Sequence, residues 1–478
     1  MEHKRVMVQL PHQHVLHSLR LAAILSLAIL AGCASTAGPE TGSNLDDLPA
    51  TWTTESAASE VEPEWWLRFQ DERLNALINE AQRLNTGIGQ AEAREQQARA
   101  QAEIAGADRL PQLSGAFDAS RQKQPLPGGD SAITENYGAS LNISWEIDLW
   151  GRLGAQSEAA REEYLASADT LRSVRQSIAG QTAKAYFAVI EAREQMAFSE
   201  ETVSALAETA RQVGNRADVG AISPADKQLA ITNLETARGG LQQRLDSEQR
   251  SSRQLETILR DYPAGEIHAP EALPPIPAAP PAGLPAELLL RRPDISAAER
   301  NLRATGLRTE AARKAFLPAI TLTGSSGRQS SELDNLLNGG FSVWSIAGQI
   351  VQPIFQGGRL SASLDLAEAR QREAAEAYAE IVLQALREVE NALAADRYLA
   401  DRETSLRAAA EAAGNAQRIA FNRYAQGLTP FITVLESQQR ALDTRSAWIA
   451  ARRARLDNRV DLHLGLGGGF GSSQETAK

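Results

Sequence analysis

The sequence contains few of the residues on which most enzyme and metal sites are built. It has one cysteine in 478 residues, and only two of its six histidines, His268 and His463, lie beyond residue 17. A single cysteine excludes a disulfide within the chain and a cysteine-based metal site. With so little histidine no Ser/His/Asp arrangement can be argued, and no glycine-rich phosphate loop follows a strand. We therefore expect no enzyme, no catalytic residue, no cofactor and no metal.

Aromatic residues are also scarce, at 5% of the chain, while hydrophobic residues reach 43% and are dominated by alanine. Alanine-rich sequence with few large side chains suits close-packed long helices better than a wide globular core. The net charge is −11, and no basic tract interrupts it. This acidic balance argues against nucleic-acid binding.

The N-terminus has the features of an export signal. Lys4, Arg5 and Arg20 precede an apolar run, residues 21–31, that is too short to span a bilayer as a helix. The run ends at Leu30-Ala31-Gly32-Cys33, which resembles a bacterial lipoprotein signal with cleavage before Cys33 and lipid on its thiol. Ala34 favours the outer membrane by the same resemblance. Removal of residues 1–32 takes away three basic residues and one acid, so the net charge becomes −13.

The clearest local pattern runs from Tyr137 to Leu149. Its odd positions are apolar and its even positions are small or polar, which predicts a strand with one apolar face and one polar face. The run is long enough to cross a bilayer when tilted. A partner strand is expected over 112–122, with residues 123–136 as the loop between them.

Long helices are expected on both sides of this hairpin. One runs from about residue 71 to 107. Another starts at Gly151 and continues without proline to Val213, about 90 Å at 1.5 Å per residue. Residues 214–224 break it, and Pro224 begins a return helix with Ser223 as its N-cap. Residues 263–293 hold nine of the twenty prolines and are expected to form an extended linker.

The whole arrangement occurs twice, at a constant offset of 207 residues. Leu110-Pro111 matches Leu317-Pro318, Gly151-Arg152-Leu153 matches Gly358-Arg359-Leu360, and Gly220 matches Gly427. The organisation expected is a signal peptide (1–32), a lipid-anchored tether (33–62), a first copy (63–262, strand hairpin about 112–149), the linker (263–293), a second copy (294–470, strand hairpin about 319–354) and a tail (471–478).

Two copies supply four amphipathic strands, which are too few to close a membrane barrel. An open edge in hydrocarbon leaves unsatisfied amides, each costing several kcal/mol, roughly. Bacterial barrels have even strand numbers from about eight upward. Two chains would give eight strands and three chains twelve, and three fit a wide channel surrounded by long helical hairpins better.

Motifs along the chain resemble the TolC-type outer-membrane efflux proteins, in particular the NodT-type lipoprotein branch. They are Trp65-Trp66, Asp148-Leu149-Trp150-Gly151-Arg152, Leu290-Arg291-Arg292-Pro293-Asp294-Ile295, Pro353-Ile354-Phe355-Gln356-Gly357-Gly358-Arg359, and Arg423-Tyr424 with Gly427. The resemblance implies a mainly α protein with membrane β structure: a homotrimer with a twelve-stranded β-barrel on an α-helical barrel. It also implies a lipid-anchored protein of the outer membrane that works with a periplasmic adaptor and an inner-membrane pump of the resistance-nodulation-division type, passively conducting small molecules outward.

Two groups of residues are the candidate sites that this resemblance implies. The helix-hairpin turns, residues 214–224 and 421–430, would dock the adaptor through Gly220, Ala221, Ser223, Gly427, Leu428 and Thr429; alternatively the two glycines are only helix C-caps. Glu436, with Asp226 and Thr433, would form the periplasmic gate, where a ring of carboxylates favours cations; alternatively they are solvated helix residues.

Two other functions remain open at this point. One is the outer-membrane channel of a type I protein secretion system, and the other is a coiled-coil surface protein or adhesin. Trp145, Trp150 and Trp344 could belong to an aromatic belt at the membrane boundary; packing between barrel and helices is the alternative, which we favour for Trp150.

Overall fold

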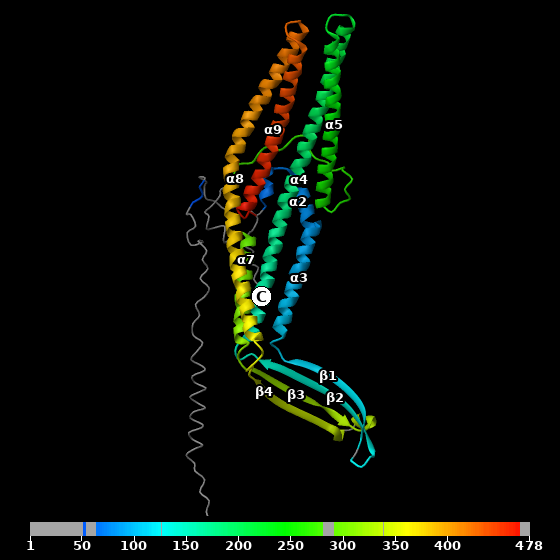
Figure 1. Ribbon diagram of the computed structural model, residues 1–478, viewed down its shortest axis with the longest axis vertical. Coiled ribbons are helices and arrows are strands. Elements are labelled where there is room, and N and C mark those ends of the chain that lie inside the picture. Colours follow the sequence, from blue (N-terminus) through cyan, green and yellow to red (C-terminus); the bar gives the residue numbers. More distant parts are fainter. Residues whose placement is uncertain (1–50, 54–63, 126, 281–290, 338, 469–478) are drawn as a thin grey trace, which may run out of the picture. The chain divides into compact units, whose positions relative to one another are not determined.

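The computed structural model describes residues 51–53, 64–125, 127–280, 291–337 and 339–468, all within one compact unit, Asn44–Lys478 (Figure 1). Cys33, the signal peptide and the tail lie outside these residues. The elements are η2 (Trp65–Phe69), α2 (Glu72–Leu84), α3 (Thr86–Ala107), β1 (Gln112–Pro125), β2 (Ser131–Ile147), α4 (Arg152–Asp218), α5 (Pro224–Ile258), α7 (Pro293–Lys314), β3 (Ala319–Ser330), η3 (Leu333–Leu337), η4 (Gly339–Phe341), β4 (Ser342–Val351), α8 (Arg359–Ala425) and α9 (Phe431–Gly465).

The internal duplication extends to the ends of the helices. Adding 207 to the bounds of α3, α4 and α5 gives the bounds of α7, α8 and α9 without a shift at either end. The strand hairpins agree as well, because Gln112↔Ser144 in the first copy and Ala319↔Val351 in the second are the same pair at this offset. The two copies therefore share one backbone plan.

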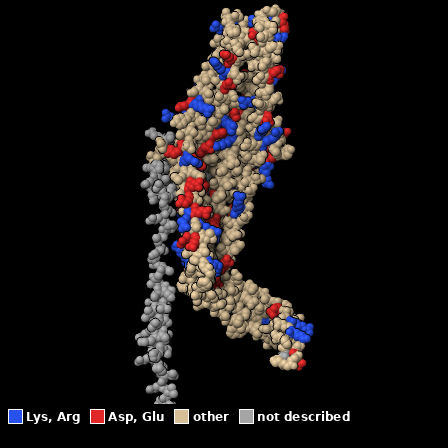
Figure 2. Space-filling view, in the orientation of Figure 1, with Lys and Arg blue, Asp and Glu red and all other residues tan. Residues whose placement is uncertain are grey.

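The four strands form one antiparallel sheet in the order β1-β2-β3-β4, so β1 and β4 are its edges. Side chains alternate between the two faces as predicted: Phe117, Ile143 and Ile350 lie on one face, and Ser144, Thr323 and Gln349 on the other. Figure 2 shows that most of the visible sheet surface carries no charged residue, whereas charges are dense on the helices. The predicted fold class, long duplicated helical hairpins with four strands, is confirmed.

Two predicted boundaries within the first copy are wrong. The helix expected over 71–107 is broken at Asn85, whose side-chain oxygen accepts from Gly87 N at 2.8 Å while its amide donates to Ile258 O at 2.7 Å. That side chain ends α2 and caps α3, because it satisfies an amide that a new helix leaves free. The loop expected over 123–136 is shorter, because pairing continues to Pro125↔Ser131 and the left-handed Gly128 and Gly129 make the turn.

The helix-hairpin turns are also narrower than predicted. Helix α4 continues through Gly214 to Asp218, and α8 continues to Ala425. One interior glycine costs a helix only about 1 kcal/mol, and Gly214 is buried against the opposing helix, where Lys227 Cε would lie 3.9 Å from an added Cβ. The turns proper are residues 219–223 and 426–430, here called the first tip and the second tip.

The largest core lies where η2 and α2 pack against α4, α5 and α9. Trp65, Phe69, Tyr186 and Phe187 are fully or almost fully buried there, and the linker contributes Ile267. Residues 263–280 of the predicted linker contain no helix or strand, whereas its last residue, Pro293, begins α7. Trp52, expected to belong to an extended tether, is instead 7% exposed among residues of α8 and α9.

No helix among the described residues combines the length and the hydropathy needed to span a membrane.

Candidate functional site

Each tip is built by the same hydrogen bonds around one glycine. Gly220 has φ 72° and Gly427 has φ 76°. Gly220 N donates to Ala217 O and Ala221 N donates to Arg216 O, both at 2.9 Å. At an offset of 207 the second tip repeats both bonds with the same lengths. The bond pattern is that of a Schellman C-cap, for which a residue other than glycine is strained. The C-cap role is thus observed, and it does not conflict with docking.

The residues predicted for docking are at the surface. Gly220, Ala221, Ser223, Gly427 and Leu428 are exposed, and Thr429 is half-buried. Ser223 Oγ accepts from Ala225 N at 3.1 Å, which caps α5 as predicted. The tips also expose large apolar side chains, with Val219 79% and Leu428 62% exposed. Such side chains favour a protein partner over water.

Behind the turns, the two tips are packed together by a small apolar cluster from all four helices. Its buried members are Val213, Ala230, Ala420, Tyr424, Phe431 and Val434. The rings of Tyr424 and Phe431 lie 5.0 Å apart. Asn233 on α5 donates to Gln438 on α9 at 3.1 Å, so polar contact continues beyond the cluster.

Tyr424 on α8 lies close to charged side chains of the first tip, and its buried hydroxyl has no hydrogen-bond partner among the described residues. Burial and the negative charge of Asp226 raise the pKa of its hydroxyl, and the cation of Arg216, 5.7 Å from the ring centroid, acts in the opposite direction. The guanidinium of Arg216 on α4 thus makes a cation–π contact with a ring from α8, which joins the first tip to the second.

The three predicted gate residues differ in exposure within one chain. Asp226 is half-buried beside Tyr424, whereas Thr433 and Glu436 are exposed on α9. Sequence reasoning missed Tyr424 and Arg216 as site residues. The available signal was that Arg423-Tyr424 and Gly427 form one motif, while Ala217 stands at the position equivalent to Tyr424 in the first copy.

The tryptophans near the sheet differ in environment. Trp145 Nε1 donates to Arg109 O at 2.9 Å, and Trp150 Nε1 donates to Pro318 O at 2.7 Å, so Trp150 joins the two copies where helices meet strands. Trp344 on β4 is 75% exposed.

No group of acidic, histidine or cysteine side chains that could hold a metal occurs among the described residues.

A family model described as "Outer membrane efflux protein" matches residues 77–259 and 284–468, which correspond to the two copies. The chain belongs to this family. It is 34% identical over 418 residues to the outer membrane protein OprJ of Pseudomonas aeruginosa, covering 85% of this chain and 86% of OprJ. It is 30% identical over 467 residues to the probable outer membrane lipoprotein SilC of Salmonella typhimurium, covering 95% and 99%. Among solved structures, the Campylobacter jejuni CmeC outer membrane channel has a TM-score of 0.83 at 27% identity, covering 88% of this chain and 90% of that channel.

Family membership confirms the predicted function and location: the protein is an outer-membrane efflux component. The family description names efflux, and the CmeC structure is described as an outer membrane channel, which favours efflux over the secretion alternative and over the adhesin hypothesis.

Proposed function

We propose that three copies of this chain form a passive duct through which small molecules, delivered by an inner-membrane pump and a periplasmic adaptor, leave the cell. The observation that carries the proposal is the four-stranded sheet, apolar on one face and polar on the other, with an open edge on β1 and another on β4. Three such sheets joined edge to edge give twelve strands and leave no unpaired edge in lipid. The apolar face would meet lipid and the polar face would line the duct.

The tips are proposed to be the docking end and the gate. Gly220, Ala221, Ser223, Gly427, Leu428 and Thr429 would contact the adaptor, because the turns present exposed apolar and backbone groups together. The cation–π contact of Arg216 with the Tyr424 ring would hold the tips closed, with the negative charge of Asp226 near the Tyr424 hydroxyl. Glu436, one per chain, would place three carboxylates near the axis and favour cations there.

Cys33 is proposed to carry the lipid anchor. Acyl chains contribute about 0.8 kcal/mol per buried methylene, and a stable anchor needs more than one of them. Because the sheet provides its own attachment to the membrane, Cys33→Ser should impair delivery to the outer membrane more than conductance of the purified protein.

The test compares two arginine substitutions on one strand. Ile346, at the middle of β4, is 75% exposed on the apolar face, and its neighbour Ala347 is exposed on the polar face. An arginine facing the middle of a bilayer costs about 2–4 kcal/mol. Ile346→Arg should therefore strongly reduce insertion and channel events in planar bilayers, while Ala347→Arg should insert normally and shift ion selectivity toward anions. Equal insertion of both variants, or no conductance from the unmodified protein, would contradict the duct.

A further inference from the structure

An aromatic residue marks the end of the apolar face in each copy. Tyr137 on β2 and Trp344 on β4 are counterparts at the offset of 207, and both lie on this face. Trp145 lies toward the helices on the same face, and the strand between it and Tyr137 rises about 20 Å when it is tilted by about 40°. The apolar band of a membrane barrel is about 25 Å tall and ends in aromatic girdles. Tyr137 and Trp344 therefore mark the boundary on the side away from the helices, which is the outer side in the proposed duct.

An arginine follows this boundary in each copy. Arg121 is the next residue of β1 on the apolar face beyond the partner of Tyr137. Arg328 on β3 is its counterpart and stands in the same relation to Trp344. Figure 2 shows basic side chains gathered near the end of the sheet that lies away from the helices. An arginine on a lipid-facing side is strongly unfavourable at the middle of a bilayer and is tolerated at its boundary, so both guanidinium groups are expected at the level of the lipid headgroups.

The arginine is repeated, but its acidic partner is not. Arg121 Nε lies 3.1 Å from Glu135 Oε1 on β2, and the two side chains are 70% and 36% exposed. The counterpart of Glu135 is Ser342, which cannot form an ion pair. Arg328 instead donates to Leu336 O of η3 at 3.4 Å. An ion pair as exposed as the first contributes little to stability, so it does not account for an arginine in both copies.

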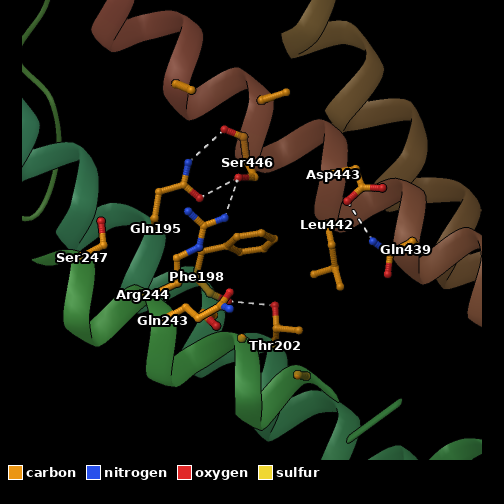
Figure 3. Close-up of a pocket in the computed structure, with 15 residues that line it drawn as sticks. Gln195, Phe198, Thr202, Gln243, Arg244, Ser247, Gln439, Leu442, Asp443 and Ser446 are labelled. Atoms are coloured by element: carbon orange, nitrogen blue, oxygen red, sulfur yellow. Dashed lines mark hydrogen bonds between the residues drawn. The ribbon is translucent and has the colours of Figure 1, made fainter. Parts of the chain in front are cut away.

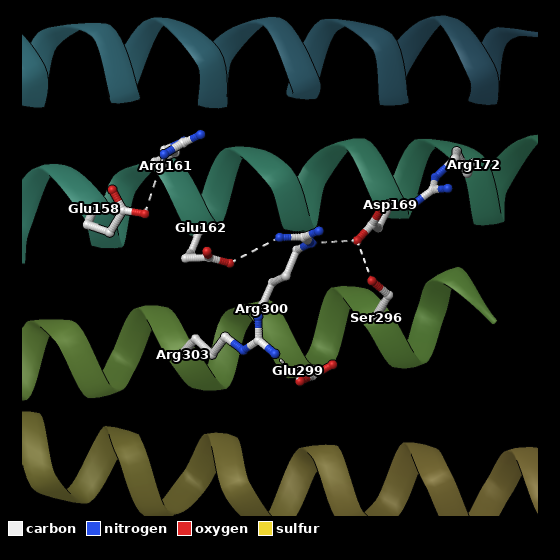
Figure 4. A network of polar contacts seen from close by, with 9 residues as sticks. All are labelled: Glu158, Arg161, Glu162, Asp169, Arg172, Ser296, Glu299, Arg300 and Arg303. Atoms are coloured by element: carbon white, nitrogen blue, oxygen red, sulfur yellow. Dashed lines mark hydrogen bonds and ion pairs between the residues drawn. The ribbon is translucent and has the colours of Figure 1, made fainter. Parts of the chain in front are cut away.

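Arginines on the helices connect elements that no backbone pairing joins. Arg300 on α7 lies 2.9 Å from Asp169 and 3.3 Å from Glu162, two carboxylates of α4 (Figure 4). Arg244 on α5 donates to Ser446 Oγ of α9 at 3.3 Å (Figure 3). The strands β1 and β2 are already joined by backbone pairing on both sides of Arg121, so they do not need its side chain to hold them together.

An apolar groove lies beside Arg328 on the same face of the sheet. Its lining includes Phe117 of β1, Leu141 of β2 and Leu336 of η3. Arg328 belongs to the row of paired residues that contains Phe117, whereas Leu141 lies one row nearer to the helices on this face. The groove is therefore apolar along its length and has a cation at its outer end. A membrane lipid has the same profile, with an acyl chain below a polar headgroup.

We propose that Arg121 and Arg328 bind the phosphate groups of lipid in the outer leaflet of the membrane. The proposal rests on the proposed duct, in which three chains would place six such arginines around the barrel. Arginine suits this role because its planar fork donates two parallel hydrogen bonds to a phosphate. An acyl chain of the lipid lies in the groove beside Arg328. Lys123, exposed two residues beyond Arg121 on the same face, adds a second cation in the first copy.

Lipid retention tests the proposal without any substitution. The full-length protein is placed in phosphatidylcholine nanodiscs containing a small fraction of bis-phosphorylated lipid A, and the lipid it retains on release is counted by native mass spectrometry. Retention should be about tenfold higher than for the same lipid without phosphates, because each cation near an anionic headgroup strengthens binding severalfold. Equal retention of the two lipids would overturn the phosphate site. Complete displacement by inorganic phosphate would overturn lipid as the ligand.

Paired substitutions test the two arginines themselves. Arg121→Gln with Arg328→Gln should abolish most of the difference between the two lipids, a loss of about tenfold. The matched control is Arg211→Gln with Arg303→Gln, which removes two helix arginines that are 62% and 58% exposed and should leave retention unchanged. An equal loss in both double variants would show a general effect of net charge and would overturn the assignment of the site.

A substitution of Glu135 separates phosphate binding from a structural ion pair. If Arg121 served only to pair with Glu135, then Glu135→Gln would lower lipid retention as much as Arg121→Gln. The proposal predicts the opposite, because Glu135→Gln frees the guanidinium for a phosphate and removes a competing negative charge. Retention of bis-phosphorylated lipid A by Glu135→Gln should therefore equal or exceed that of the unmodified protein. A loss would overturn the role of Arg121.

Failure of this proposal and failure of the duct are distinguishable. A protein that forms conducting trimers in planar bilayers but retains both lipids equally would overturn the arginine site and leave the duct standing. A protein that neither inserts nor conducts would overturn the duct, and with it the placement of the two arginines at a membrane boundary.

Discussion

The first tip and the second tip have the same backbone and different side chains. The left-handed glycine and the two capping bonds are repeated with equal lengths. The first tip also has a serine cap on α5 and an ion pair of 2.6 Å between Lys227 and Asp218. The second tip begins α9 at Pro430 with no side-chain cap. Its residues equivalent to Asp218 and Lys227 are Ala425 and Val434, which cannot form an ion pair.

This difference distinguishes the backbone features that both turns require from the side-chain interactions that only one copy contains. The turn between the two long antiparallel helices contains the left-handed glycine in both copies. The second tip forms without the charged residues that are present in the first tip. The Lys227–Asp218 ion pair is an addition of the first tip to its own turn, whereas Arg216 and Tyr424 form a contact between the tips.

The largest effect is expected from the shared glycine. Gly427→Val and Gly220→Val force a β-branched residue into the left-handed region, at a cost of about 1–2 kcal/mol or more. Each should distort its tip and lower drug resistance about tenfold in a strain that depends on this protein. Gly427→Asn and Gly220→Asn are matched controls, because asparagine tolerates this conformation. If the valine and asparagine variants behave alike, the turn geometry is not what docking requires.

A smaller effect is expected from the contact between the tips. Arg216→Gln and Tyr424→Leu each remove one partner of the cation–π contact, which is expected to contribute about 0.5–1 kcal/mol, so the ratio of open to closed channels should rise about two- to fivefold. Single-channel recording of purified protein measures this ratio. Asp218→Asn breaks only an exposed ion pair and should change it little. A large effect of Asp218→Asn, with none from Arg216→Gln, would show that the Tyr424 contact does not hold the tips closed.

The smallest effect is expected from the cap that only the first tip has. Ser223→Ala removes the bond to Ala225 N and should lower stability by about 1 kcal/mol. Efflux should fall only slightly, because Ser223 is one of six proposed docking residues and the second tip forms without a side-chain cap. Thermal unfolding in detergent measures the stability, and a resistance assay measures the efflux. Unchanged stability would contradict the capping role of the Ser223 hydroxyl, and unchanged efflux would remove this hydroxyl from the docking surface.

The sequence predicts most of the fold because the fold is periodic. Alternation at Tyr137–Leu149 indicates a two-faced strand, and the offset of 207 transfers that inference to the second copy. The boundaries that were wrong depend on single side chains or on pairing partners: Asn85 bonds to a helix end 173 residues away, and the pairing past Gln122 requires the other strand.

Only those parts of the candidate site that depend on residues close together in the sequence could be predicted. Gly220 and Gly427 follow from turn chemistry within a few residues. The contact of Arg216 with the Tyr424 ring joins residues 208 positions apart, which no local pattern encodes. Glu436 was paired with Asp226 in the predicted gate, but within one chain they lie in different surroundings, and only the assembled trimer would bring copies of Glu436 together.

The most direct measurement is photo-cross-linking in cells from Ala221 and, separately, from its counterpart Leu428, with mass spectrometry of the captured protein. We expect both positions to capture a periplasmic adaptor that belongs to a proton-driven pump. Capture of an adaptor of an ATP-driven exporter would move the protein to secretion. Capture of only its own subunits from both positions would contradict the assignment of the tips as the docking end of an efflux duct.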